Sequence, residues 1–85
     1  MSKHLEMYTK NFCIYCYKAK EVINNNPDMS FSVTEYNVDT QKAHLDTLKE
    51  RLPGVKTVPI VVLDGQKLGG YQELTESVNR MLLKG

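Results

Sequence analysis

The dipeptide Asp64-Gly65 restricts how this 85-residue chain folds more than any other feature of its sequence. It lies between an apolar run at residues 58–63 and a short segment at residues 66–68. Asp-Gly between two such runs is a strong signal for a two-residue β-hairpin, because the favoured turn needs a positive φ at both central residues. The sequence therefore predicts an antiparallel strand pair here, which Gly69-Gly70 ends.

Two strand–helix units precede this hairpin. Residues 5–9 alternate apolar and polar side chains, and residues 31–38 are rich in β-branched and aromatic side chains, so each stretch predicts a strand. The stretch between them predicts a helix that the Asn-Asn-Asn-Pro run at 24–27 ends. Its apolar positions at helical spacing are Cys13, Cys16, Ala19, Val22 and Ile23.

Two further helices complete the pattern. The second is expected to be capped by Asp39 or Thr40 and ended by Pro53-Gly54. Its apolar positions are Ala43, Leu45, Leu48 and Leu52. The third covers residues 71–83, with Leu74, Val78, Met81 and Leu82 expected to face inward.

The resulting order is β-α-β-α-β-β-α. A strand–helix–strand unit gives a parallel pair through a right-handed crossover, whereas the hairpin gives an antiparallel pair. We therefore predict an α/β fold, a four-stranded mixed sheet flanked by three helices, in a single domain over residues 1–85.

Composition limits the classes of function. The net charge of +1 argues against nucleic-acid binding as the main task. No segment is long and apolar enough to predict a membrane span, and the first ten residues lack the apolar stretch of a secretory signal. Two cysteines are too few for a disulfide-built secreted domain, so we expect a cytoplasmic protein.

Both cysteines lie in the stretch CIYC, residues 13–16, between the first strand and its helix. If the helix begins near Cys13, the unpaired amides of its first turn and the helix dipole favour the thiolate, to which Lys10 adds a positive charge. Cys16 lies one turn further on the same face, within reach for a disulfide. We therefore expect an exposed Cys13, which titrates below the free-cysteine value of about 8.5, and a deeper Cys16 that attacks second.

Other interpretations of this pair stay open on the residues alone. A structural disulfide would close a very short loop and gain little stability, and a reducing compartment disfavours it. A zinc site needs about four ligands, and His4 and His44 do not supply a second pair. Two inert core cysteines are the third interpretation. The position after a strand and at a helix start favours a redox pair.

Two later segments also have a structural and a functional interpretation. Pro59 in Thr57-Val58-Pro59 is tolerated at the start of a strand, but a cis bond there would also turn the Val58 amide and carbonyl outward toward an extended peptide. The run Gly69-Gly70-Tyr71-Gln72 is a strand-to-helix turn, whose bare amides at a helix N-terminus could equally bind a carboxylate. Tyr15 is a core aromatic or the wall of a small-thiol site, and Lys56 is solvated or pairs with a substrate carboxylate.

Three separated motifs resemble those of the small dithiol glutaredoxins. YTKNFCIYC resembles the family's strand–Lys–CxYC segment, KTVP its cis-proline loop, and GGYQEL its Gly-Gly turn into the last helix. The resemblance extends over essentially the whole chain, in the order that the predicted elements require. It implies the thioredoxin fold and a groove that binds glutathione.

The resemblance also implies roles for individual residues. Cys13 would be the nucleophile and Cys16 the resolving thiol. Val58 would pair with the cysteinyl backbone of glutathione beside a cis Pro59. The complete set of residues implied to bind glutathione is Lys10, Tyr15, Lys56, Thr57, Val58, Pro59, Gly70, Tyr71 and Gln72, of which the last three would hold the γ-glutamyl end. No metal ligand is implied.

Two positions depart from the family's pattern. Ile14 stands where the family commonly has proline directly after the first cysteine, so this chain keeps an amide donor there. Gln72 stands where relatives often carry an aspartate, and the missing carboxylate is expected to weaken recognition of the substrate's ammonium group.

The resemblance implies an enzyme, a glutathione-dependent thiol–disulfide oxidoreductase that reduces protein disulfides and glutathione mixed disulfides as a monomer. Its implied partners are glutathione and disulfide-containing or glutathionylated proteins, ribonucleotide reductase among them, with no nucleic acid or membrane. One alternative is that the protein donates electrons to ribonucleotide reductase and is itself reduced by thioredoxin reductase. A second is an iron–sulfur carrier in which two chains each supply Cys13 and glutathione supplies the other ligands.

Overall fold

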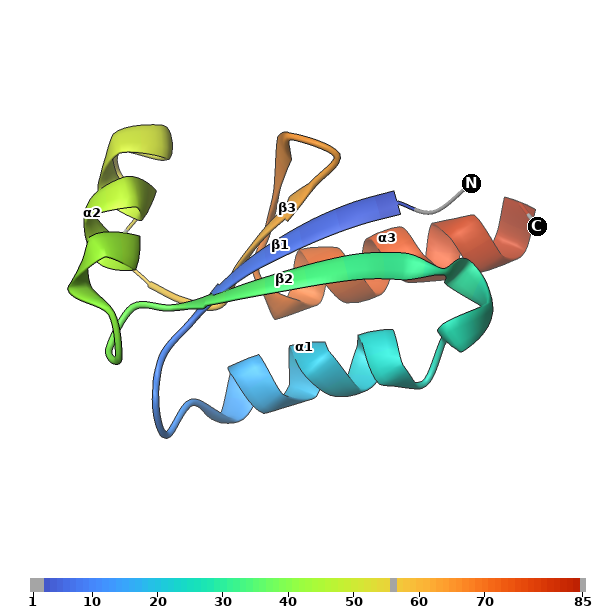
Figure 1. The fold of residues 1–85 in the computed structure, drawn as a ribbon. Coiled ribbons are helices and arrows are strands. Elements are labelled where there is room, and N and C mark those ends of the chain that lie inside the picture. Colours follow the sequence, from blue (N-terminus) through green and yellow to red (C-terminus); the bar gives the residue numbers. More distant parts are fainter. Residues whose placement is uncertain (1–2, 56, 85) are drawn as a thin grey trace.

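The computed structural model describes residues 3–55 and 57–84. Its centre is a four-stranded mixed sheet with the strand order β2-β1-β3-β4 (Figure 1). The strands are β1 (Lys3–Thr9), β2 (Phe31–Asn37), β3 (Ile60–Leu63) and β4 (Gln66–Gly69). β1 pairs parallel with β2 and antiparallel with β3, and β3 pairs antiparallel with β4, so the predicted sheet is confirmed.

Three α-helices accompany the sheet, as predicted. They are α1 (Ile14–Asn24), α2 (Lys42–Arg51) and α3 (Tyr71–Lys84), with a short 3₁₀ helix, η1 (Pro27–Met29), after α1. In Figure 1, α1 and α3 lie along the same side of the sheet, whereas α2 stands at its far end. No helix within the described residues has the length and apolar character that a bilayer crossing requires.

Alternation along the central strands divides the core between the two faces of the sheet. On the first face, Leu5, Met7 and Val61 pack with Ala19 of α1 and with Leu74 and Val78 of α3. On the second face, Tyr8, Ile60 and Val62 pack with Leu48 of α2. Side chains that follow each other along a strand point to opposite faces, so β1 and β3 contribute to both clusters.

The predicted end of the second helix before Pro53-Gly54 is confirmed, since α2 ends at Arg51 with Leu52 as its C-cap, but the predicted N-cap, Asp39 or Thr40, is wrong. α2 begins at Lys42, and its N-cap is Gln41, whose side chain makes no capping hydrogen bond. Asn37 Oδ1 instead accepts hydrogen bonds from the amides of Asp39 (2.8 Å) and Thr40 (3.0 Å) and holds both in a turn. The Asp39 carboxylate is occupied elsewhere, because it accepts a hydrogen bond from the amide of Asn11.

Three smaller predictions also differ from the structure. β3 begins at Ile60 rather than Val58, because Val58 and the buried Pro59, joined by a cis peptide bond, lie in the preceding loop. Ala43 of α2 is exposed. Leu82 is 56% exposed, since the last turn of α3 extends beyond the start of β1 (Figure 1).

Arg51 fastens the last turn of α2 to the central strand. Its guanidinium donates to both carboxylate oxygens of Glu6, at 3.2 and 3.0 Å, and to the hydroxyl of Tyr8 at 3.0 Å. The hydroxyl of Tyr36 donates to the same carboxylate. The hydrogen bond from Arg51 holds the pKa of Glu6 below its usual value, against the opposing effect of burial. α2 is therefore held by this bidentate pair in addition to the packing of Leu48.

Substituting Glu6→Gln should destabilise the fold in a pH-dependent way. Because the folded-state pKa of Glu6 is depressed, its stabilisation is present above the unfolded value of 4.5 and is lost as the pH falls through the folded-state pKa. We expect the variant to lose about 1 kcal/mol of unfolding free energy near neutral pH, and less near pH 3, in urea denaturation.

Glu50→Gln is the control, since Glu50 is exposed on the same turn of α2 and no ion pair of it is seen among the described residues. If Glu6→Gln lowered the unfolding free energy equally at both pH values, the charge of Glu6 would contribute nothing to the stability of the fold.

Candidate active site

The cysteine pair lies where the central strand passes into α1. Cys13 is the N-cap of this helix, with extended backbone angles, and its sulfur accepts a hydrogen bond from the amide of Cys16 at 3.2 Å. The two Cα atoms are 5.2 Å apart, and the side chains are joined as a disulfide. The prediction that Cys13 sits at the helix start, with Cys16 within disulfide reach, is thus confirmed.

The predicted exposure of Cys13 is wrong for this oxidised form. Cys13 is 6% exposed and Cys16 is 3% exposed, so both are buried. The sulfur of Cys13 is bonded to that of Cys16 and lies 4.0 Å from the carbonyl oxygen of Val58. This contact brings the loop before β3 against the cysteine pair.

The loop that leads into Cys13 is held by side chains from the end of β2. Asn37 Nδ2 donates to Asn11 Oδ1 at 3.1 Å, and the amide of Asn11 donates to Asp39 at 3.0 Å. These contacts leave Phe12 in a left-handed backbone conformation, with a φ of 54°. The strand order places this loop and the start of β3 side by side, because β1 and β3 are antiparallel neighbours.

A groove of about 630 Å³ collects most of the residues that the resemblance assigned to glutathione. It runs between the end of β1, the first turn of α1, the loop before β3 and the start of α3. Its lining consists of Lys10, Tyr15, Thr57, Val58, Pro59, Tyr71, Gln72 and Glu73. Lys56 lies outside the described residues, so its predicted role has no structural counterpart here.

The two ends of the groove are tied together by close contacts. The rings of Tyr15 and Tyr71 lie with their centroids 6.0 Å apart, and the ammonium group of Lys18 lies 5.1 Å from the centroid of Tyr15. At Gly70, a Cβ atom would lie 3.4 Å from the carbonyl oxygen of Pro59, an ordinary van der Waals contact, so Gly70 adjoins the loop before β3. Tyr15 is 54% exposed and forms a wall of the groove rather than part of the core.

Glu73 is a groove residue that the sequence interpretation missed. Its carboxylate accepts a hydrogen bond from the amide of Gly70 at 2.8 Å, while the carbonyl of Gly70 accepts the first hydrogen bond of α3 from Leu74. The signal was a glutamate in the third position of the helix, which is half of a capping box. Glu73 therefore occupies one of the amides that was expected to bind a carboxylate, and the amides of Tyr71 and Gln72 are left for that task.

A second hollow, of about 500 Å³, continues from the groove toward α2. It shares Lys10, Thr57 and Val58 with the groove and adds Lys49 of α2. Its floor is apolar and is formed by Val38, Leu45, Leu48 and Val55. The sequence interpretation did not single out Lys49, because nothing local marks which helical lysine faces the groove.

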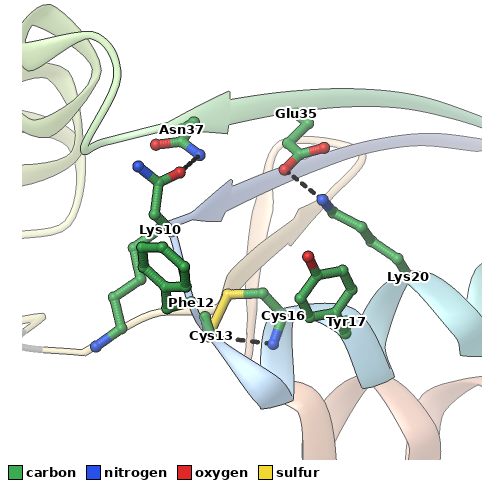
Figure 2. Close-up of a pocket in the computed structure, with 9 residues that line it drawn as sticks. Lys10, Phe12, Cys13, Cys16, Tyr17, Lys20, Glu35 and Asn37 are labelled. Carbon is green, nitrogen blue, oxygen red and sulfur yellow. Dashed lines mark hydrogen bonds and ion pairs between the residues drawn. A yellow bond between two sulfur atoms is a disulfide. The ribbon is translucent and has the colours of Figure 1, made fainter.

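A third hollow, of about 240 Å³, lies on the β2 side of the cysteine pair (Figure 2). Figure 2 shows the disulfide beside Phe12 and Tyr17, with Lys20 and Glu35 joined across the cavity. Glu35 pairs with Lys20 at 2.7 Å and accepts a hydrogen bond from the buried Thr9 hydroxyl. Burial raises the pKa of Glu35, but the bonds from Lys20 and Thr9 outweigh it, so the net shift is downward and the carboxylate is ionised at neutral pH.

No cluster of three or more His, Cys, Asp or Glu side chains that could hold a metal ion is found within residues 3–55 and 57–84.

Comparisons with known proteins agree with this geometry. The sequence model of a family described as Glutaredoxin matches residues 5–68. Glutaredoxin 3 of Escherichia coli strain K12 is 32% identical over 71 residues, which cover 84% of this chain and 81% of that protein.

Solved structures show the same fold. Glutaredoxin 1 from Francisella tularensis has a TM-score of 0.67 and 26% identity, and the match covers 94% of this chain and 96% of that one. A buckwheat glutaredoxin–glutathione complex has a TM-score of 0.71 and 23% identity, with coverage of 89% and 68%, and supports the fold alone. The predicted thioredoxin fold is therefore confirmed.

The helix-capping geometry predicts an activated Cys13 thiol in the reduced protein. In a Cys16→Ser variant, which leaves one thiol, we expect the pH midpoint of iodoacetamide alkylation to lie below the value of about 8.5 for a free cysteine. The amide donor at 3.2 Å and the α1 dipole both favour the thiolate. A midpoint that matches free cysteine, measured in parallel, would remove the activation argument.

Proposed function

The chain belongs to the glutaredoxin family, whose members are thiol–disulfide oxidoreductases, and on this premise we propose that it reduces protein disulfides and glutathione mixed disulfides with glutathione as the electron donor. One observation carries the proposal. The groove brings together, from four separate segments, all but two of the residues assigned to glutathione, and the carbonyl oxygen of one of them, Val58, lies 4.0 Å from the Cys13 sulfur. The absent two are Lys56, which is not described, and Gly70, which adjoins the groove.

The first chemical step would use Cys13 alone. Its thiolate attacks the glutathione sulfur of a glutathionylated substrate, which forms a Cys13–glutathione disulfide. The original S–S bond breaks, and the substrate sulfur leaves as a thiolate that takes a proton from solvent. The amide of Cys16, which donates to the Cys13 sulfur, and the dipole of α1 favour the attacking thiolate.

Two routes would complete the reaction. A second glutathione thiolate attacks the glutathione sulfur of the mixed disulfide, which releases oxidised glutathione and the Cys13 thiolate. Alternatively, the Cys16 thiolate attacks the Cys13 sulfur, which releases reduced glutathione and forms the disulfide seen in the structure. Two further glutathione molecules then reduce this disulfide by two thiol–disulfide exchanges and leave as oxidised glutathione. The Cα separation of 5.2 Å is suited to this second route.

The groove offers a distinct contact to each part of the tripeptide. The backbone of Val58 pairs with the cysteinyl residue as an added strand would. The amides of Tyr71 and Gln72, at the N-terminus of α3, bind the γ-glutamyl carboxylate. The carboxylate of Glu73 lies at the same helix start. It would pair with the ammonium group of the γ-glutamyl residue, in place of the aspartate that relatives often carry at the position of Gln72. Lys10 and Lys49 bracket the opposite end, where the glycyl carboxylate would lie.

The wider setting follows from this chemistry. Regeneration by glutathione requires a reducing compartment, so we place the protein in the cytoplasm. Its protein partners would be disulfide-containing or glutathionylated proteins, and ribonucleotide reductase belongs to the first class. The catalytic unit would be a monomer in a single domain, since one chain supplies both cysteines and the described groove.

The two cysteines should differ in their effect on activity. Cys13→Ser should abolish reduction of a small glutathione mixed disulfide, because the nucleophile is lost. Cys16→Ser should keep this activity, because a second glutathione can resolve the intermediate. The measurement is NADPH consumption with glutathione and glutathione reductase. Equal loss in both variants would indicate a strictly dithiol mechanism instead.

The electron donor is tested with the same small mixed disulfide and two reductants. We expect turnover with glutathione plus its reductase and none with thioredoxin reductase alone. Turnover only with thioredoxin reductase would identify the alternative electron donor. Silence in both assays, together with a brown colour in freshly purified protein, would favour the iron–sulfur carrier.

A further inference from the structure

Large apolar side chains are exposed beside the disulfide, on residues that the proposed chemistry does not use. Phe12 is fully exposed, and Ile14 and Tyr17 are each 64% exposed. Ile14 and Tyr17 are three residues apart on α1, which places them on the same face of the helix. These three residues, here called the apolar patch, lie away from the groove, none of whose lining residues belongs to the patch.

Folding alone gives no reason for this arrangement. Phe12 has a φ of 54°, a left-handed conformation that is unfavourable for a bulky side chain. The contacts from Asn37 and Asp39 to Asn11 accompany this strained conformation, which leaves the phenyl ring of Phe12 exposed to water instead of burying it in the core. Clustered exposed apolar side chains of this kind mark interaction sites on soluble proteins.

The charge around the apolar patch is predominantly positive, although Glu21 lies one helical turn after Tyr17 and Glu35 lines the hollow beside the patch. The segment from Lys10 to Lys20 contains three lysines and no acidic residue, in a chain whose 11 basic and 10 acidic residues nearly balance. Glu35 of β2 pairs with Lys20. No carboxylate is paired with Lys10 or Lys18 among the described residues. Lys18 lies one helical turn after Ile14, and its ammonium group is 5.1 Å from the centroid of the Tyr15 ring, so it places a positive charge between the patch and the groove.

Room for a substrate side chain exists beside the patch. The 240 Å³ hollow is lined by Phe12 and Tyr17 and reaches both cysteines, on the β2 side of the disulfide (Figure 2). The groove lies on the β3 and α3 side. A polypeptide whose cysteine approaches Cys13 could therefore place a neighbouring side chain in the hollow while glutathione occupies the groove.

We propose that the apolar patch, with Lys18, docks an acidic polypeptide segment that carries an apolar side chain next to its glutathionylated cysteine. The occupant follows from the positive charge of the 10–20 segment and from the continuity of the patch with the disulfide and the hollow. This inference rests on the proposed function, since it specifies the protein substrate of the same site. The bond changes are those of the first step above, with the cysteine of the segment as the leaving thiolate.

Three synthetic peptides, each with a central glutathionylated cysteine, test the proposal. The first has phenylalanine next to the cysteine and flanking glutamates, the second exchanges glutamate for lysine, and the third exchanges phenylalanine for serine. We expect kcat/KM for the first peptide to exceed that for the second by about tenfold at low salt, with the gap narrowing as salt is added. The third peptide should be slower than the first by about fivefold.

Variants of the patch separate docking from chemistry. Phe12→Asn keeps a residue that tolerates the left-handed backbone, and Tyr17→Gln keeps a helix former. Each should lower kcat/KM for the first peptide by about fivefold and leave the small glutathione mixed disulfide unchanged. Lys18→Glu should reverse the preference between glutamate and lysine peptides. The matched controls are Leu82→Ser and Lys67→Glu, which change an exposed apolar and a charged residue away from the disulfide.

The overturning results are distinct. Equal rates for the three peptides, or variants that slow the small disulfide as much as the peptide, would overturn the docking role while the proposed function stands. A dimer in sedimentation velocity that Tyr17→Gln dissociates would show that a second copy covers the patch, and would also overturn it. No turnover of the small disulfide by the unmodified protein would remove the proposed function and the docking inference together.

Discussion

The pairing of β1 on both of its edges is the constraint on which the rest of this structure depends. Parallel pairing with β2 fixes the path of α1, and antiparallel pairing with β3 brings the loop before β3 to the edge where β1 ends. Cys13 and the Val58 carbonyl therefore meet although 45 residues separate them in the chain. Because side chains of β1 are buried on both faces, the strand cannot shift by one residue without exchanging its two sets of core contacts.

The features that the sequence predicted correctly have local causes. The Asp64-Gly65 hairpin, the end of α1 in the asparagine run and the helix start at Cys13 each follow from a few neighbouring residues. The features that it missed depend on contacts between distant segments. The N-cap of α2 was predicted wrongly because Asn37 holds the amides of Asp39 and Thr40 in a turn and the Asp39 carboxylate accepts a hydrogen bond from Asn11. The burial of Cys13 accompanies its disulfide and its contact with the loop at Val58.

The site followed the same division. Most residues of the groove could be predicted because three sequence motifs contain them. Seven of the nine residues assigned to glutathione line the groove, and Gly70 lies next to it. Glu73 and Lys49 were missed because each matters only through its place in the folded groove. Glu73 changes the chemistry of the site most. It satisfies the Gly70 amide in this structure, so an incoming carboxylate meets two amides and a nearby negative charge rather than three bare donors.

Lys10 borders all three hollows around the disulfide, namely the groove, its extension toward α2 and the cavity on the β2 side. Its long, flexible side chain is exposed, so its ammonium group can turn toward any of them without disturbing the core. The three hollows thus share one mobile counter-ion. An anionic group bound in one hollow attracts the ammonium group of Lys10 away from the other two. The affinity of each hollow for anions therefore depends on whether its neighbours are occupied.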